Sequence, residues 1–186
     1  MHIRILVFAL ATLMGCSISH YKKRLSAEEA THYRALEVYM DQPDASGERP
    51  TTERLAYLKL KTEDERNKWL KDKKLPSSGG EMSLWDRFYK YEAHIRDAID
   101  RGDVQEGWTL DMVYMSWGRP MKREKPPACG ASRCWRYIYR FEQLDDGTVQ
   151  VWVEGSKDEY RAVRIYDREV EVGDNMVLSI KTKKVR

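Results

Sequence analysis

Apolar residues follow two different periods along this chain. From Ser26 to about Trp117 they recur three and four positions apart, which is the spacing of one face of a helix. From Cys134 onward they alternate with polar residues, as in a half-buried strand. We therefore predict an α+β fold in which N-terminal helices pack on a C-terminal antiparallel meander of three to four strands.

Capping residues mark the helices of the first part. Ser26 with Glu29, and Thr62 with Glu65, have the form of capping boxes, and Thr52 is placed to cap a helix between them. The clearest helix is expected to begin at Ser83, with Asp86 in its first turn, and to end at Gly102. Its apolar stripe consists of Leu84, Phe88, Tyr91, Ile95 and Ile99. His94 lies beside that stripe, and we interpret it as a packed or half-exposed side chain.

Alternation and turn residues mark the strands of the second part. Asp146-Gly147 and residues 173–175 are the expected turns. The strands then fall at residues 135–142, 149–154, 160–172 and 176–184. One face of the first strand carries Trp135, Tyr137, Tyr139 and Phe141. The intervening arginines could suggest nucleic-acid stacking, but core packing and cross-strand pairing explain this strand better.

A short helix is predicted between the two parts, within VQEGWTLDMVYMSWGRP. Gly107 interrupts the chain, Thr109 can cap the helix, and Asp111 lies in the first turn, where the helix dipole favours a negative charge. Gly118 and Pro120 end it. The apolar stripe of this helix is Leu110, Val113, Tyr114 and Trp117.

The chain begins with the layout of a signal peptide. Arg4 precedes an apolar run at residues 5–14, followed by Gly15 and Cys16. This run is too short to span a bilayer, which takes roughly 20 apolar residues. Residues 13–16, LMGC, resemble the lipobox of bacterial lipoproteins, although Met14 stands where a small residue is commoner. The resemblance implies that Cys16 is acylated and becomes the first mature residue, with Ser17 favouring the outer membrane. The alternative is an ordinary secreted protein.

The short-helix segment and the first strand are similar to a second pattern, that of the BamE (SmpA/OmlA) family of outer-membrane lipoproteins. The resemblance covers roughly residues 105–155, and its matching positions are Gly107, Thr109, Val113, Gly118, Pro120, Trp135 and Tyr137. It implies helices before a small antiparallel sheet, and a role in barrel-protein assembly or envelope integrity through protein contacts. The extra helices of residues 26–100, the cysteine-bearing insert and a fourth strand depart from that family.

These patterns divide the chain into four regions. They are a signal peptide at residues 1–15, a tether at 16–25, a helical region at 26–102 and a BamE-like helix with its sheet at 103–186. The mature length suffices for one substantial core.

Two cysteines remain if Cys16 carries lipid. Cys129 and Cys134 are five positions apart, and an oxidising envelope favours a disulfide between them. Free thiols remain an alternative, and so does a metal site. A zinc site would need about two more ligands, and the histidines lie far away in sequence.

Composition limits the classes of function. With 33 Lys+Arg against 30 Asp+Glu the net charge is +3, without the basic excess of nucleic-acid binders. The sequence has no H-E-x-x-H, no G-x-S-x-G and no glycine-rich phosphate loop. We therefore expect neither a metal nor a cofactor.

The resulting hypothesis is a non-catalytic envelope lipoprotein that binds other envelope proteins, held at the outer membrane, on its periplasmic face, by its lipid. Trp108 and Trp152 are candidate partner contacts because tryptophan is common in interface hot spots. Either side chain could instead be packed. An inhibitor of an envelope enzyme and an enzyme using a carboxylate pair are the alternatives.

Overall fold

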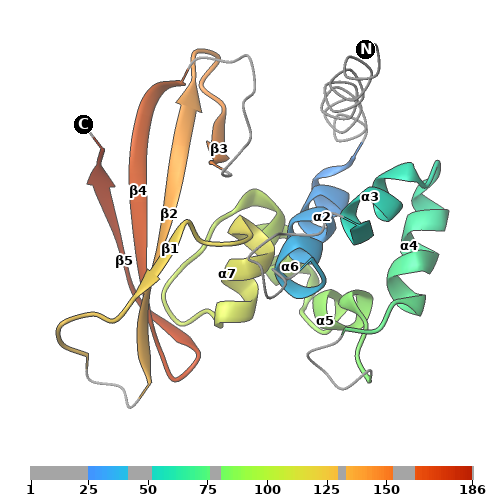
Figure 1. The fold of residues 1–186 in the computed structure, drawn as a ribbon, viewed down its shortest axis with the longest axis horizontal. Coiled ribbons are helices and arrows are strands. Elements are labelled where there is room, and N and C mark those ends of the chain that lie inside the picture. The colour runs from blue at the N-terminus through green and yellow to red at the C-terminus, as the bar shows by residue number, and fades with distance from the viewer. Residues whose placement is uncertain (1–24, 42–51, 76–80, 130–132, 153–161, 186) are drawn as a thin grey trace, which may run out of the picture. The chain divides into compact units, whose positions relative to one another are not determined.

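The computed structural model describes residues 25–41, 52–75, 81–129, 133–152 and 162–185. The leader, Cys16 and all of the tether predicted at residues 16–25 except its last residue lie outside these residues. The chain forms two compact units that divide between Asp100 and Arg101. The first is helical, and the second combines a helix with an antiparallel sheet (Figure 1). The predicted α+β class, with helices first and strands last, is confirmed.

The first unit contains short helices. They are α2 (Ala27–Tyr39), α3 (Thr52–Lys59), α4 (Glu63–Asp72), α5 (Leu84–Tyr89) and α6 (Ala93–Arg101). The capping boxes predicted at Ser26 and Thr62 are both formed, since each hydroxyl accepts the N–H three residues on and Glu29 or Glu65 accepts the N–H of its cap residue.

The start of α3 differs from the prediction. Thr52 is the first residue of this helix, and the carboxylate of Asp41 accepts hydrogen bonds from the N–H groups of Glu53 and Arg54 at 3.2 and 3.4 Å. Asp41 follows α2, so a side chain from another element satisfies the free N–H groups. Nothing local in the sequence points to this long-range cap.

The single helix predicted from Ser83 to Gly102 is wrong in its middle, where the structure has two helices. α5 ends at Tyr89, and the carbonyl of Tyr91 accepts a hydrogen bond from the Arg96 guanidinium at 2.6 Å. The carbonyl of Glu92 then starts α6 by accepting from Arg96 N–H at 3.0 Å. The apolar spacing continues through this break, so periodicity alone does not reveal it.

Buried ion pairs hold parts of this unit together. Arg66 Nε lies 2.5 Å from Glu29 Oε1, and Arg54 Nε lies 2.7 Å from Asp41 Oδ2. These side chains are at most 11 % exposed. Since a buried charge that loses its partner is costly, each pair ties α2 or its end to a later helix.

His32 lies in the same core. It is 1 % exposed, and neither ring nitrogen has a hydrogen-bond partner among the described residues. The ring meets Phe88 edge-on at 4.8 Å between centroids and lies near Trp85 and Tyr89. Burial lowers the pKa of His32 to about 4.

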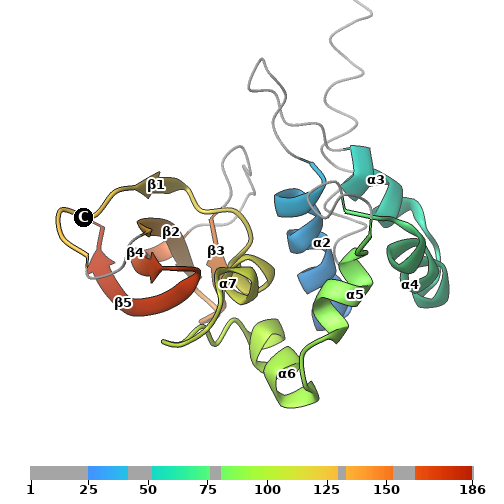
Figure 2. The same cartoon turned by 90° about the horizontal axis from the view of Figure 1, so that it is seen from below.

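The second unit begins with α7 (Leu110–Trp117), which Figure 2 shows against one face of the sheet. The strands are β1 (Lys122–Glu124), β2 (Cys134–Leu144), β3 (Val149–Val151), β4 (Ala162–Gly173) and β5 (Met176–Lys184). All pairings are antiparallel, and the strand order is β1-β2-β4-β5, with β3 also paired to β2.

This strand order corrects the predicted up-and-down meander. β2 pairs with β4 from Cys134–Gly173 to Leu144–Ala162, so β3 does not lie between them. β3 pairs with residues 141–143 of β2 and β1 with residues 136–138, both on the opposite edge from β4. Two long strands share many backbone hydrogen bonds, whereas β1 and β3, of three residues each, share one edge. β1 was not predicted, because KRE has no alternation.

Because His32 is buried, the free energy of unfolding of the first unit should depend on pH. The unfolded chain binds a proton near the ordinary pKa of 6.5, whereas folded His32 binds one only near 4. Protonation thus favours unfolding, and the part of the unfolding free energy due to His32 is lost as the pH falls from above 6.5 toward 4. The loss should reach about 3 kcal/mol.

Urea unfolding of His32→Leu at pH values across that window tests this. The variant should lose less stability on acidification than the parent does. His94→Leu is the matched control, because His94 is exposed, with 71 % of its side chain accessible. Equal acid sensitivity of His32→Leu and the parent chain would contradict this role of His32.

Candidate functional site

The first residues of the Gly107–Pro120 motif lie at the junction between α7 and the β4–β5 hairpin. Gly107, with φ of +84°, donates its N–H to the Val177 carbonyl at 2.9 Å, and Val177 returns a bond to the Trp108 carbonyl at 2.7 Å. Leu110 N–H reaches the Asn175 carbonyl at 3.1 Å. The chain before α7 is therefore held to the hairpin by three backbone hydrogen bonds.

The predicted cap residues of α7 act as expected. Thr109 is the N-cap, with its side chain accepting from the Met112 N–H, and Asp111 lies in the first turn. Gly118 ends the helix at φ of +74°, a value that favours glycine, and its carbonyl accepts the Tyr139 hydroxyl at 3.2 Å. Half-buried Pro120 lies between α7 and β1.

The remaining motif residues pack inside the unit. Val113 is fully buried and Tyr137 is 3 % exposed. The Tyr137 ring meets Tyr114 of α7 edge-on at 6.1 Å. Half-buried Trp135 carries the guanidinium of Arg123 at 4.3 Å from its ring centroid. The motif thus positions α7 and β2, and it supplies no reactive group.

The two candidate tryptophans differ in exposure. Trp108 is 5 % exposed, so this side chain offers almost no surface to a partner, and the packed alternative describes it better. Trp152 is half-buried, and its backbone N–H donates a hydrogen bond to the Arg140 carbonyl at 2.8 Å. Trp108 lies in the segment before α7 that is hydrogen-bonded to the β4–β5 hairpin. The residues next to Trp108 in the sequence do not predict this pairing or the burial.

Cys129 and Cys134 are joined in the structure, with their sulfur atoms 2.06 Å apart. Cys134 is the first residue of β2, so the disulfide connects that strand to the segment that follows β1. In the described part of the chain, no group of three or more His, Cys, Asp and Glu side chains is placed to hold a metal ion.

The strands divide their charges between two faces of the sheet. Side chains alternate along each strand, and the register assigns every position to one face. We call the face that carries Tyr139 and contacts α7 the inner face, and the opposite one the outer face. Charged strand residues of the outer face are Lys122, Glu124, Arg136, Arg140, Glu142, Asp167, Glu169, Glu171, Lys181 and Lys183.

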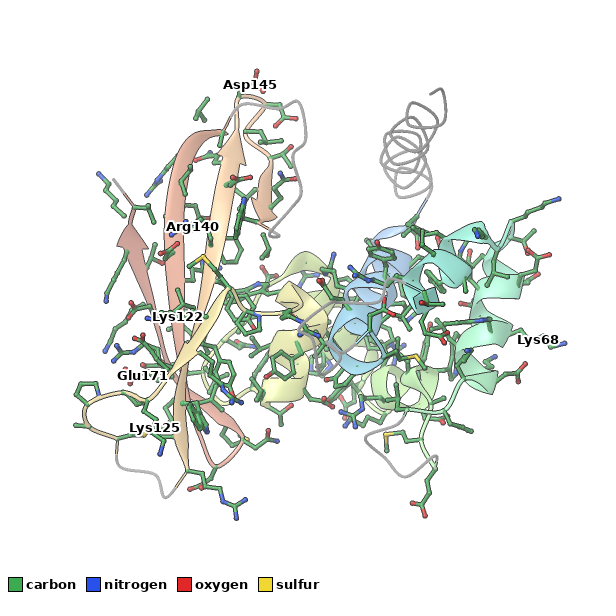
Figure 3. All side chains as sticks on the ribbon, viewed as in Figure 1. Lys68, Lys122, Lys125, Arg140, Asp145 and Glu171 are labelled. Carbon is green, nitrogen blue, oxygen red and sulfur yellow. A yellow bond between two sulfur atoms is a disulfide. The ribbon has the colours of Figure 1, made fainter. Side chains whose placement is uncertain are left out.

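The outer face balances five basic residues against five acidic ones, and ion pairs join them across strands. Figure 3 labels Lys122, Arg140 and Glu171 of this set. Arg136 of β2 is the centre, with its guanidinium nitrogens 2.8 Å from Glu171 and 3.7 Å from Glu169 on β4. It also reaches Glu124 of β1 at 3.5 Å. Lys183 of β5 lies 2.6 Å from Glu169, and Arg140 lies 3.0 Å from Asp167.

This network sets the pKa values of its members. The hydrogen bond from Arg136 lowers the pKa of Glu171, and the bond from Lys122 lowers the pKa of Glu124. The bonds to Glu171 and Asp167 in turn raise the pKa of Arg136 and Arg140. The outer face is therefore a satisfied set of cross-strand charge pairs.

The inner face carries only basic charges on its strands. They are Arg123, Arg164, Arg168 and Lys184, assigned by the same register. α7 packs against part of this face, where the Trp117 ring meets Tyr139 and Phe141 edge-on at 5.2 and 5.1 Å. Trp117 is fixed there by a bond from its Nε1 to the Gly102 carbonyl at 2.9 Å.

Arg168 lies over the aromatic rings of this face. Its guanidinium carbon is 4.9 Å from the Phe141 centroid, 5.3 Å from Trp117 and 5.9 Å from Tyr166. Phe141 and Tyr166 are stacked on each other at 5.5 Å. Arg164 adds a second guanidinium 5.3 Å from the Tyr166 ring. We call Phe141, Tyr166, Arg164, Arg168 and Lys184 the cationic-aromatic patch.

The patch was not predicted from the sequence. Its signal is the position of basic residues in β4, since Arg164 and Arg168 have even numbers while Asp167, Glu169 and Glu171 have odd ones. Along a strand that difference places opposite charges on opposite faces. To see that these arginines share a face with Tyr139, one needs the register of β4 against β2. The predicted meander did not pair these two strands.

Two acidic residues of the first unit have raised pKa values. Burial is the main cause for both Glu28 and Asp100, and the charge of Asp100 raises the pKa of Glu28 further. Glu28 accepts a hydrogen bond from the Tyr89 hydroxyl, and Asp100 accepts one from Thr31 at 2.6 Å. These bonds join α2 to α5 and α6, which is a structural use of the two carboxyl groups.

No family model, no curated protein sequence and no solved structure matches this chain. Across the described ranges, none of the helices is both long enough and apolar enough to cross a membrane.

The disulfide predicts a thiol count. Under denaturing, non-reducing conditions the purified Cys16→Ser chain should show no reactive thiol, and a reductant should release two. Alkylation followed by mass measurement gives the number directly. Two thiols alkylated before reduction, in protein exported to an oxidising compartment, would show that Cys129 and Cys134 are not paired.

The outer network predicts unequal roles for its two arginines. Arg136→Met removes one partner from each of three carboxylates and should lower the free energy of unfolding by about 1 kcal/mol. Arg140→Met, the matched control, removes the partner of Asp167 and should cost less. Urea unfolding at neutral pH measures both variants.

The pH dependence gives a second readout. Lowered pKa values of Glu171 and Glu124 mean that their contribution is present above the ordinary pKa of 4.5 and is lost as the pH falls through the folded values. Arg136→Met should lose less stability on acidification than the parent does. Equal costs and unchanged acid sensitivity would show that Arg136 is not the centre of the network.

Proposed function

We propose that this chain is a non-catalytic lipoprotein of the bacterial cell envelope, anchored by acylated Cys16 and acting through protein–protein contacts in outer-membrane assembly or integrity. The anchor follows from the lipobox-like residues 13–16, and the class of role follows from the BamE-like motif. The lipid would hold the chain at the periplasmic face of the outer membrane.

The cationic-aromatic patch is the observation that carries the binding role. Arginine is enriched in the hot spots of protein interfaces, and in the patch the buried rings of Phe141 and Tyr166 hold the Arg168 guanidinium on one face of the sheet. Its charges are not balanced on that face, in contrast to the outer network. An unbalanced charged surface favours a partner of opposite charge.

Fractionation of cells that express the parent chain or Cys16→Ser tests the anchor. The parent chain should be found with outer membranes, begin at residue 16 and carry the added mass of acyl chains. Cys16→Ser should lose the modification and leave the membrane fraction. Cys129→Ser is the matched control, because it removes a cysteine that the lipid does not use.

Mass spectrometry decides the outcome. An unmodified thiol at Cys16 in a chain that retains its leader would overturn the proposed anchor. Cross-linking of the anchored chain then identifies the class of partner. A barrel or assembly protein agrees with the proposal, whereas a soluble envelope enzyme as the sole partner would replace it with the inhibitor role.

A further inference from the structure

We propose that the cationic-aromatic patch binds an acidic, extended polypeptide segment of a partner protein, with Arg168 as the residue that receives a carboxylate. This inference rests on the proposed function and names the chemistry of its partner. It is carried by the position of Arg168, the absence of acidic residues among the described strand positions of the inner face, and the row of basic groups beside Arg168.

Arg168 is held in place by aromatic rings and has no ionic partner among the residues that the structure describes. The three rings around it fix the guanidinium by cation–π contact. Within the described residues, the Arg168 side chain has no ion pair and no hydrogen bond. A guanidinium oriented in this way retains its N–H donors for a carboxylate, which it can bind through two parallel hydrogen bonds.

The described strand residues of the inner face do not supply that carboxylate. The strand positions that share this face with Arg168 include Gln143, Thr182 and Lys184, and none of those assigned by the register is acidic. In the β2–β3 turn, Asp145 accepts the N–H of Asp146, and Asp146 accepts the N–H of Thr148. These turn carboxylates have local donors.

A row of basic groups accompanies Arg168. Arg164 lies on the same face four residues earlier in β4, which corresponds to roughly 13 Å along a strand. Lys184 of β5 pairs with Tyr166 between them. At the ends of β4 and β5, Arg164 and Lys184 line an open depression of about 310 Å³ together with Ala162, Val163, Ile165 and Val185. Arg164 and Lys184 form no ion pair with any residue that the structure describes. An extended chain with acidic residues on one side matches this row.

An anionic membrane is the competing occupant, and the patch suits it less well. Recognition of acidic lipids typically uses clusters of four to eight Lys and Arg residues. The patch has three basic residues, and the rings of Phe141 and Tyr166 beside them are 5 % and 8 % exposed. Buried rings that fix one guanidinium favour a specific carboxylate contact over diffuse attraction to a surface.

Binding to a synthetic peptide tests the inference. The probe alternates Glu and Thr, which places all carboxylates on one side of an extended chain. The matched peptide replaces each Glu with Gln. Titration calorimetry with the purified Cys16→Ser chain, at low salt, avoids interference from the lipid. The Glu peptide should bind, the Gln peptide should not, and added salt should weaken binding.

Variants locate the site. Arg168→Glu should weaken peptide binding by roughly tenfold or more, because a charge-assisted hydrogen bond is lost and a repulsion is added. Arg168→Lys keeps the charge but not the planar fork, so it should give an intermediate loss. Lys183→Glu is the matched control, since it makes the same charge change on the outer face of β5. Far-ultraviolet circular dichroism checks that each variant is folded.

Each outcome has a defined meaning. Equal weakening by Arg168→Glu and Lys183→Glu would show general charge attraction and overturn the assigned site, as would absence of binding by the parent chain. Tighter binding to vesicles of phosphatidylglycerol and phosphatidylcholine than to the peptide, lost in Arg168→Glu, would replace the polypeptide with a membrane. None of these results depends on acylation, so a failed peptide test leaves the Cys16 anchor standing, and a failed anchor leaves the peptide result standing.

Discussion

The long antiparallel pairing of β2 with β4 is the constraint on which the second unit depends. It extends from Cys134 opposite Gly173 to Leu144 opposite Ala162, so it fixes which side chains share a face over the whole length of both strands. A shift of one residue would exchange the two faces. The aromatic layer under α7, the neutral outer network and the basic inner row all follow from this single register.

The two faces stabilise the unit in different ways. On the inner face, Trp117, Tyr139 and Phe141 exclude water, and Gly118 lets the chain leave α7 while its carbonyl binds the Tyr139 hydroxyl. On the outer face, Arg136 and its carboxylates join β1, β2 and β4. The acidic strand residues lie on the outer face, so the basic residues of the inner face have no carboxylate partner among the described strand positions, and the proposed binding role rests on this difference.

The sequence predicts features that depend on neighbours in the chain. The capping boxes at Ser26 and Thr62, the cap at Thr109 and the alternation of β2 are local, and the structure contains all of them. Features that depend on distant residues were missed. The cap that Asp41 provides, the placement of β3 on the far edge of β2 and the break between α5 and α6 each require tertiary contacts.

The candidate site shows the same division. Basic residues at alternate positions of β4 are visible in the sequence, but their common face becomes clear only once β4 is paired with β2. The residue type of Trp108 favours a contact with a partner protein, but its segment is hydrogen-bonded to the β4–β5 hairpin and the side chain is buried. The motif residues Gly107 and Gly118 predict where the backbone turns and say nothing of what the unit binds.

Site-specific photo-cross-linking in living cells tests the central claim, that partners bind the inner face. A photoreactive residue at Thr182, which pairs with Arg168, should cross-link to a partner protein, whereas the same residue at Lys181 or Lys183 on the outer face should not. Cross-links from the outer positions but not from Thr182 would contradict the account.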